Sequence, residues 1–246
     1  MMKVTGLGHV HSSHSHDGTY TLKELADLAR KKGCSFLLTC EHAEDITQEG
    51  YQDIIEECER LSDESFIIIP GLEFMYPDYV HIIGIGLAKH PGIHPLKEQI
   101  GAIKDASGIP VLAHADSCES VPYEDLADIA GVEAWSGRYH GRFAPQRKGL
   151  EILDDLRSKT GRDVPCFSGL DLHGAREVRD IMLRMDVTRL DRESILQALG
   201  RGDFVNANRW FALGALEHPS FLKRNAFHII NSVYGAVKWF RKKTNL

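Results

Sequence analysis

The sequence lacks most of the features that would place a protein outside the ordinary globular class. Its five cysteines are an odd number, widely spaced and without a CxxC pair, so neither a disulfide framework nor a zinc ribbon is expected. No stretch reaches the roughly 20 apolar residues of a membrane span, and the N-terminus lacks the apolar run of a signal peptide. We therefore expect a soluble, cytoplasmic protein.

An excess of positive charge is also missing. The net charge of the 246 residues is -6, whereas a protein that coats long nucleic acid normally carries a dominant basic footprint. Long nucleic acid is therefore not expected as a partner. The chain is 43% hydrophobic and long enough for one α/β domain of barrel size.

Short apolar runs alternate with amphipathic segments along most of the chain. The runs predict strands at 35–40, 65–71, 79–86, 109–115, 131–136, 164–170 and 203–208. The amphipathic segments predict helices at 21–33, 50–62, 95–108, 123–131, 147–161 and 191–202, the first capped by Thr21. This alternation predicts βαβ units and a parallel sheet, which at this length closes most simply as a barrel over residues 1–217.

The segment 218–246 differs from the rest because it contains no acidic residue. Six basic residues accompany apolar residues near helical spacing, which predicts a basic amphipathic helix. Three roles are open for this helix: docking on the barrel, peripheral contact with anionic membrane lipid, or attraction of an anionic substrate.

Unusual polar residues fall repeatedly at the ends of the predicted strands, where α/β barrels assemble their active sites. Nine of them are candidate metal ligands: His9, His11, Asp17, His42, Glu73, His81, His114, Asp171 and His173. Residues i and i+2 of a strand face the same side, so a pair such as His9 and His11 can share one ion. Imidazole with carboxylate suits zinc, manganese or iron, and nine ligands imply two or three divalent ions.

Six motifs resemble those of the PHP (polymerase and histidinol phosphatase) family. They are "HVHSSHSHDG", "LTCEH", "PGLEF", "VHIIGIG", "LAHAD" and "GLDLHG", which together span residues 4 to about 207. The resemblance implies a distorted (β/α)7 TIM-like barrel that holds three metals at its strand ends. Family members usually begin DxHxH, and this chain has Leu7 in place of the aspartate, which removes a residue that supports the histidines.

The resemblance also implies how the ligands divide among the metals. The first metal takes His9, His11, Glu73 and Asp171, the second takes Glu73, His81 and His114, and the third takes Asp17, His42 and His173. Glu73 is then the bridging ligand. Glu41 and Asp116 stay outside the ligand set, since each is equally well a supporting carboxylate.

The implied activity is hydrolysis of phosphate esters, either monoesters or short diesters, by a hydroxide that bridges two metals. Glu73 and Asp171 serve the reaction as ligands, Arg138 clamps the phosphate, and His14 is a candidate proton donor. His16, His140 and Arg142 are further candidate substrate contacts. Two alternatives stay open: an amidohydrolase-type metal hydrolase and a non-catalytic, metal-stabilised binding module. The oligomeric state is not indicated by the sequence.

Overall fold

The computed structural model describes residues 1–139 and 141–244, and its strands form two mixed six-stranded sheets. The first sheet has the order β12-β11-β10-β1-β2-β4. These strands are β1 (Met2–Val10), β2 (Phe36–Thr39), β4 (Ile67–Ile69), β10 (Met182–Val187), β11 (Phe204–Ala207) and β12 (Ala212–Gly214). The second sheet has the order β3-β5-β6-β7-β8-β9. Its strands are β3 (Glu41–His42), β5 (Gly71–Tyr76), β6 (Val80–Ile85), β7 (Ile109–Leu112), β8 (Gly131–Ser136) and β9 (Cys166–Gly169).

The α/β class is confirmed, but the closed seven-stranded barrel is not observed, because neither sheet closes on itself in the described residues. Single residues interrupt two runs of chain: Cys40 separates β2 from β3, and Pro70 separates β4 from β5. Several pairings are antiparallel, among them β1 with β10 and β5 with β6. The predicted parallel pattern missed these pairings because a hairpin and a crossover leave similar apolar runs in the sequence.

The two sheets approach each other where the chain leaves β9. The N–H of Leu170 donates to the carbonyl of Gly8 (2.9 Å), and the N–H of His11 donates to the carbonyl of Leu172 (2.8 Å). An isolated parallel bridge joins Val10 and Leu172. The ends of β1 and β9 therefore lie side by side, which brings residues 9–11 next to residues 171–173.

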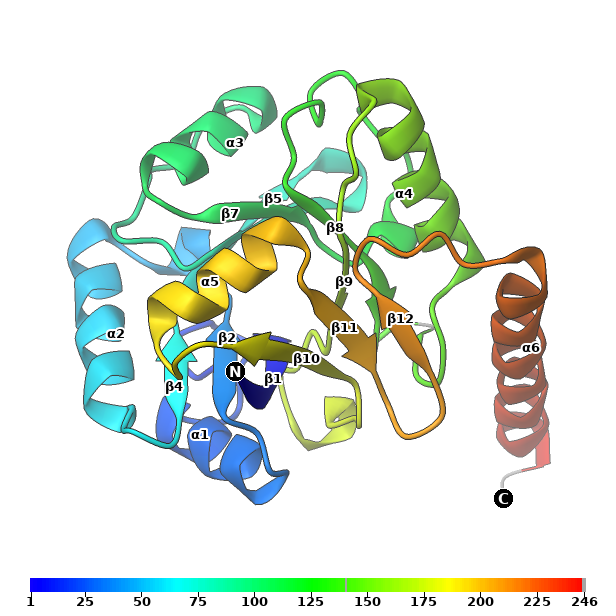
Figure 1. Ribbon diagram of the computed structural model, residues 1–246, viewed down its shortest axis with the longest axis horizontal. Helices are drawn as coiled ribbons and strands as arrows, with labels where there is room; N and C mark the ends of the chain where they lie inside the picture. The colour runs from blue at the N-terminus through cyan, green and yellow to red at the C-terminus, as the bar shows by residue number, and fades with distance from the viewer. Residues whose placement is uncertain (140, 245–246) are drawn as a thin grey trace.

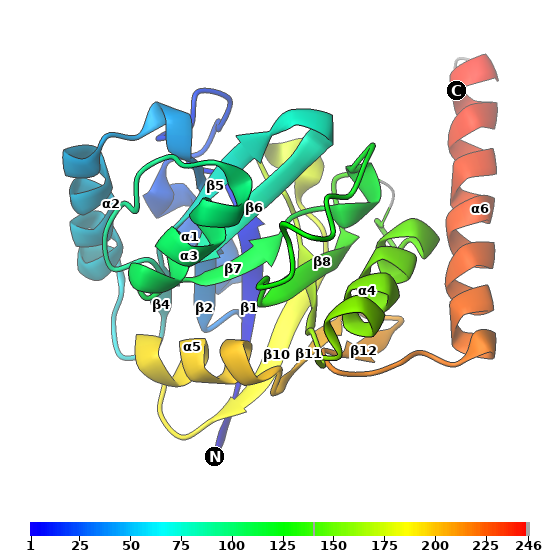
Figure 2. The same cartoon turned by 90° about the horizontal axis from the view of Figure 1, so that it is seen from above.

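In the described residues, six α-helices accompany the sheets. They are α1 (Leu22–Lys31), α2 (Gln48–Leu61), α3 (Leu96–Asp105), α4 (Arg147–Thr160), α5 (Arg192–Arg201) and α6 (Phe221–Thr244). The predicted cap of the first helix is confirmed, since the Thr21 hydroxyl accepts from the Glu24 N–H and Glu24 accepts in return from Thr21. Figure 2 shows the strands in the middle, with α2 on one side and α4, then α6, on the other.

Two expectations about secondary structure were wrong. The segment predicted as a helix at 123–131 instead forms turns over 123–128, with Leu126 and Ile129 fully buried, and Gly131 already belongs to β8. The strand β10 was not expected, although Leu183, Met185 and Val187 alternate with exposed charged residues as one-sided strands do.

The C-terminal helix α6 lies at the edge of the molecule, beyond α4 (Figure 1). Its first turns contact the body: Phe227 is buried, Arg224 forms an ion pair with Asp154 (2.8 Å), and Asn231 donates to the carbonyls of Ala144 and Pro145. Among the described residues, none of the helices combines the length and apolar character needed to span a membrane. The division at residue 217, the membrane contact and the cytoplasmic location stay predictions.

Candidate metal centre

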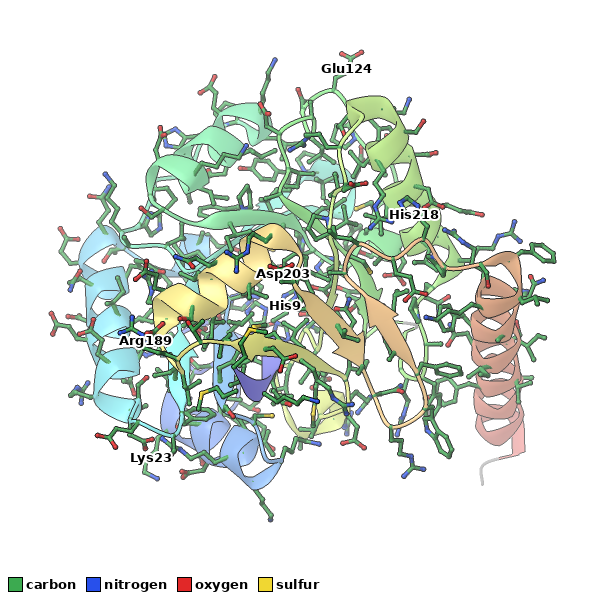
Figure 3. All side chains as sticks on the ribbon, in the orientation of Figure 1. His9, Lys23, Glu124, Arg189, Asp203 and His218 are labelled. Atoms are coloured by element: carbon green, nitrogen blue, oxygen red, sulfur yellow. The ribbon has the colours of Figure 1, made fainter. Side chains whose placement is uncertain are left out.

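The candidate ligands converge on the carboxylate of Glu73, which lies in β5 and is 1% exposed. Five imidazoles surround its two oxygens, each with a nitrogen within 3.5 Å: those of His9, His11, His42, His81 and His114. A carboxylate offers about four lone-pair directions, so one side chain can serve two positive centres. We call the nine proposed ligands the histidine cluster. Figure 3 shows His9 in the middle of the molecule, whereas Lys23 and Glu124 lie at its outline.

The backbone at the cluster is bent in an unusual way. Outside glycine, the left-handed region of φ is rarely occupied, yet it is adopted by His9 (φ 56°), His114 (φ 26°) and Asp171 (φ 49°). The pairing of β1 with β2 shifts register between Leu7 and Val10, around His9. The alternation expected for His9 and His11 is therefore broken by an irregularity, and strain of this kind concentrates at functional sites.

Two groups of ligands meet at Glu73. His9 and His11 place their Nε2 atoms 3.5 and 3.4 Å from Glu73 and 3.6 Å from Asp171 Oδ1. On the other side, His81 Nδ1 and His114 Nε2 lie 3.1 and 3.2 Å from Glu73 Oε1. The ligand atoms of His9, His11 and Glu73 lie within 4.8 Å of one another, and so do those of Glu73, His81 and His114.

A third group lies nearer the surface. Asp17 places its two carboxylate oxygens 3.2 Å from His42 Nε2 and from His173 Nε2. The turn that carries Asp17 requires glycine next to it, because a Cβ on Gly18 would lie 1.9 Å from the carbonyl oxygen of Ser12. The structure therefore brings together all three ligand groups that the family resemblance implied.

Glu133 in β8 supports the cluster, and sequence analysis missed it. Its Oε2 lies 2.7 Å from Nδ1 of His9, and both side chains are buried. A carboxylate in this position fixes the ring and leaves Nε2 as the free nitrogen. Gly169 makes room, since a Cβ there would lie 2.5 Å from Glu133 Oε2. The signal was a single acid inside the apolar strand "GVEAWS".

This contact bears on the missing aspartate at Leu7. The Leu7 side chain is 1% exposed and packs in the hydrophobic core. The carboxylate that orients His9 comes instead from a strand 124 residues further along the chain. Support for the first histidine is therefore present despite the departure from the DxHxH pattern.

A second buried acid, Glu41, holds the histidine-rich turn. It accepts the Ser12 N–H (3.1 Å to both oxygens) and the Ser15 hydroxyl (2.7 Å). Ser15 in turn accepts the N–H of His42 (3.0 Å) and lies 3.4 Å from Nδ1 of His11. Glu41 thus acts as a supporting carboxylate. By contrast, both carboxylate oxygens of Asp116 are buried without a described partner, and burial raises its pKa to about 6.

The electrostatics of the cluster favour cations. Burial lowers the pKa of His9, but the negative charges of Glu133 and Glu73 outweigh that effect and raise it well above the usual value. Burial also lowers the pKa of His114, and the contact with Glu73 reverses the sign. For His11 burial prevails, so its pKa falls well below the usual value. The buried carboxylates thus favour positive charge at two of these three imidazoles, and a bound cation would supply the same charge.

Orphaned atoms give an independent test of the fit to metal ions. His9 Nε2, His11 Nε2, His42 Nδ1 and Asp171 Oδ2 are buried without a hydrogen-bond partner in the described residues. A buried polar atom left unpaired costs about 1 to 3 kcal/mol. All four belong to proposed ligands and need an electropositive partner or a donor. The donor set of nitrogen and oxygen therefore fits divalent cations.

Arg138 and Tyr139 follow β8 and lie at the open side of the cluster. Arg138 Nη1 is 3.3 Å from Asp171 Oδ1 and 2.6 Å from His173 Nδ1, and about a third of the side chain is exposed. The ring of Tyr139 lies 4.9 Å from that of His114, and burial raises the pKa of its hydroxyl. Tyr139 was not predicted as a site residue. The signal that could have identified it is its position directly after the candidate Arg138 in the sequence.

The other predicted substrate contacts have partners away from the cluster. Nε2 of His14 lies 2.9 Å from Glu57, and Nδ1 of His16 lies 2.8 Å from Asp45. His16 nevertheless also lies near Asp17 and His42, and these three residues form a further candidate ligand group. Arg142 donates to the Tyr234 hydroxyl (3.3 Å) and lines a separate cavity. His140 lies outside the described residues.

Comparisons with protein-family models and with curated protein sequences find no match. Among solved structures, the chain is similar to a two-domain protein from Bacteroides vulgatus that contains a predicted PHP-like metal-dependent phosphoesterase. The TM-score is 0.66 at 16% identity, over 87% of this chain and 67% of that one. It is also similar to a lesion-specific endonuclease from Pyrococcus furiosus (TM-score 0.61, 17% identity, 84% and 59% covered). A third is an amidohydrolase from Chromobacterium violaceum with bound sulfate and no metal (0.55, 16%, 82% and 97%).

These likenesses show that the chain shares its fold with a protein that contains a predicted PHP-like phosphoesterase, which agrees with the resemblance in the motifs at the level of the fold alone. At such identities the activity does not follow from the fold. One of the three similar proteins is an endonuclease, so the comparisons give no support to the expectation that excluded long nucleic acid as a substrate.

Proposed function

We propose that the protein is a metal-dependent hydrolase of phosphate esters, with its reaction at the histidine cluster. The observation that carries this proposal is the buried carboxylate of Glu73 with five imidazoles within 3.5 Å of its oxygens. Together with Asp171, this arrangement suits two or three divalent ions of zinc, manganese or iron. Bound ions of this kind act as Lewis acids and lower the pKa of water toward about 7.

The chain's own residues have distinct tasks in this proposal. Glu73 and Asp171 hold the ions, and Glu133 keeps the ring of His9 in one orientation. Arg138 presents a partly exposed guanidinium at the open side of the cluster, where it can bind the non-bridging oxygens of a phosphate.

The substrate class in this proposal is a phosphomonoester or a short phosphodiester. The similar structures include a predicted phosphoesterase and an endonuclease, which supports ester hydrolysis at phosphorus and leaves both ester types in the test. Cleavage of amides is the alternative chemistry, and metal binding without turnover is the non-catalytic one.

The experiment is turnover of p-nitrophenyl phosphate and bis-p-nitrophenyl phosphate by protein loaded with manganese or zinc. We expect metal-dependent release of p-nitrophenol, with Glu73→Gln lowering kcat/KM by at least about 10³-fold. Glu151→Gln on α4 makes the same chemical change at an exposed pair with Arg147 and should leave the rate unchanged. Loaded protein that hydrolyses amides but neither phosphate ester would overturn the proposal.

A further inference from the structure

Three arginines from three separate segments surround one cavity of about 240 Å³ beside the candidate metal centre. Arg142 follows β8, Arg179 lies between β9 and β10, and Arg209 lies in the turn between β11 and β12. Asn208, Trp210 and Asp180 also line this cavity, which we call the arginine cavity. Figure 1 shows the three chain segments coming together below β12 and β9.

The guanidinium groups of the arginine cavity have no carboxylate partner in the part of the chain that the structure describes. Asp180, the one acid at the cavity, is engaged by Lys32 at 2.7 Å. Arg179 donates from Nη1 to its neighbour's carbonyl, and its Nε is buried without a described partner. Burial lowers the pKa of Arg179, and the charge of Arg142 lowers it further. Two acids act on these arginines without forming an ion pair: Glu177 raises the pKa of Arg179, and Arg209 helps to lower the pKa of Asp180. Positive charge is therefore in excess at the cavity.

Aromatic rings hold two of these side chains in place. The guanidinium carbon of Arg142 lies 5.5 and 5.6 Å from the ring centres of Phe143 and Tyr234. That of Arg209 lies 4.4 Å from the ring centre of Trp210. Stacking of this kind restrains an arginine while leaving its N–H groups free to donate. The donors are therefore ordered before any ligand arrives.

The arginine cavity adjoins the open side of the histidine cluster. A Cβ on Gly137 would lie 3.5 Å from Cγ of Arg179, so the stem of Arg179 packs against the residue that precedes Arg138. Arg138 itself reaches Asp171 at 3.3 Å. The short segment after β8 thus contacts both sites: Gly137 packs against Arg179, and Arg138 contacts Asp171.

We propose that the arginine cavity is a subsite for a second phosphate group of the substrate. This inference rests on the proposed function, and it narrows the substrate class to compounds with at least two phosphate groups. Arg142, Arg179 and Arg209 match phosphate because each guanidinium can donate two parallel hydrogen bonds to its oxygens. The phosphate that is hydrolysed lies at the histidine cluster, and the second one is only bound.

The test compares the dinucleotide TpT with pTpT and TpTp, which differ from it only by a terminal phosphate. Binding is measured by calorimetry on chelator-treated protein, so that nothing is hydrolysed, and kcat/KM on metal-loaded protein. We expect at least one phosphorylated dinucleotide to bind about tenfold more tightly than TpT. Arg179→Gln and Arg209→Gln should each remove most of this preference, and Arg209 is exposed, so its variant should fold normally.

The control is Arg189→Gln, which removes an exposed arginine that pairs with Asp191 and should keep the full preference. Equal binding of all three dinucleotides, or an equal loss in the control, overturns the subsite. Inorganic phosphate titrated alone distinguishes a free-ion site: if it binds as tightly as pTpT, the assignment to the substrate is wrong. A binding preference without any turnover would instead support the subsite and contradict the proposed function.

Discussion

The histidine cluster and the arginine cavity differ in the sign of the charge that their side chains carry. In the cluster, the carboxylates of Glu73, Asp171 and Glu133 are buried, and atoms of four proposed ligands lack a partner. In the cavity, three guanidinium groups lack an acid among the described residues. The cluster therefore needs cations from outside the chain, whereas the cavity offers positive charge that an anion can bind.

The difference between the two sites lies in how far they are buried. Desolvation makes an unpaired buried carboxylate costly, so loss of cations should be felt in the stability of the whole fold. The arginines are more exposed: Arg142 and Arg209 face solvent, where water replaces a missing anion. The histidine cluster should thus be coupled to folding, whereas the arginine cavity should affect binding alone.

Removal of metal is the sharpest way to test this contrast and has the largest expected effect. With ions at a hundred to a thousand times their Kd, binding stabilises the fold by about 2.7 to 4.1 kcal/mol. We expect chelation to lower the melting temperature by roughly 10 °C for a chain of this size. Thermal melts with and without chelator measure this shift.

The matched comparison for chelation is a thermal melt in which a ligand of the arginine cavity is added. Adding pTpT to chelated protein at ten times its Kd should stabilise the fold by only about 1.4 kcal/mol, and therefore shift the melt less than saturating metal does. An equal melting temperature before and after chelation, in protein shown to contain metal, would contradict the coupling of the cluster to folding.

Glu133→Gln is expected to have the next largest effect. An amide can still contact His9 but holds its ring less firmly, and loss of such a supporting carboxylate costs 10- to 100-fold in metal affinity. Metal titration with a competing chelator measures the change. Glu151→Gln serves again as the control, and unchanged affinity in Glu133→Gln would mean that His9 is oriented by the backbone alone.

How far these sites follow from sequence depends on the distance along the chain between partners. The proposed ligands were predictable because each lies in a short motif in or next to a strand, such as the pair His9 and His11 at the end of β1. The pair of Glu133 with His9 spans 124 residues and depends on which strand ends adjoin. The arginine cavity is built from three distant segments, and only Arg142 was noted among its residues.

The fold shows the same limit. Helices with strong local signals, such as the one capped by Thr21, were predicted together with their caps. The prediction of a closed barrel was wrong, because a break at Cys40 or Pro70 is a single residue, and nothing in its local pattern indicates that pairing passes to another sheet. Likewise β10 depends on pairing with β1 in the opposite direction. Direction and closure are properties of long-range pairing.

Ser15→Ala tests whether the supporting turn matters as much as the ligands. The change removes the hydroxyl that donates to Glu41 and accepts from the His42 N–H, leaving buried groups unpaired. We expect a loss of about 1 to 3 kcal/mol in the free energy of unfolding, measured by denaturant titration. Ser158→Ala, at an exposed position of α4, should change it by less than about 0.5 kcal/mol. Equal stability of both variants would show that Glu41 finds other donors.

The smallest effect is expected at His14, which the sequence nominated as a proton donor. A side chain that protonates the leaving group contributes about 10²- to 10⁴-fold to the rate. In the structure its Nε2 lies 2.9 Å from Glu57, and the side chain is about one third exposed, which describes a surface pair worth less than about 1 kcal/mol. We therefore expect His14→Asn to lower kcat by less than about threefold across the pH range of activity. A fall of a hundredfold, with the basic or acidic limb of the pH profile lost, would restore the catalytic role, because an ion pair at the surface has no means to produce it.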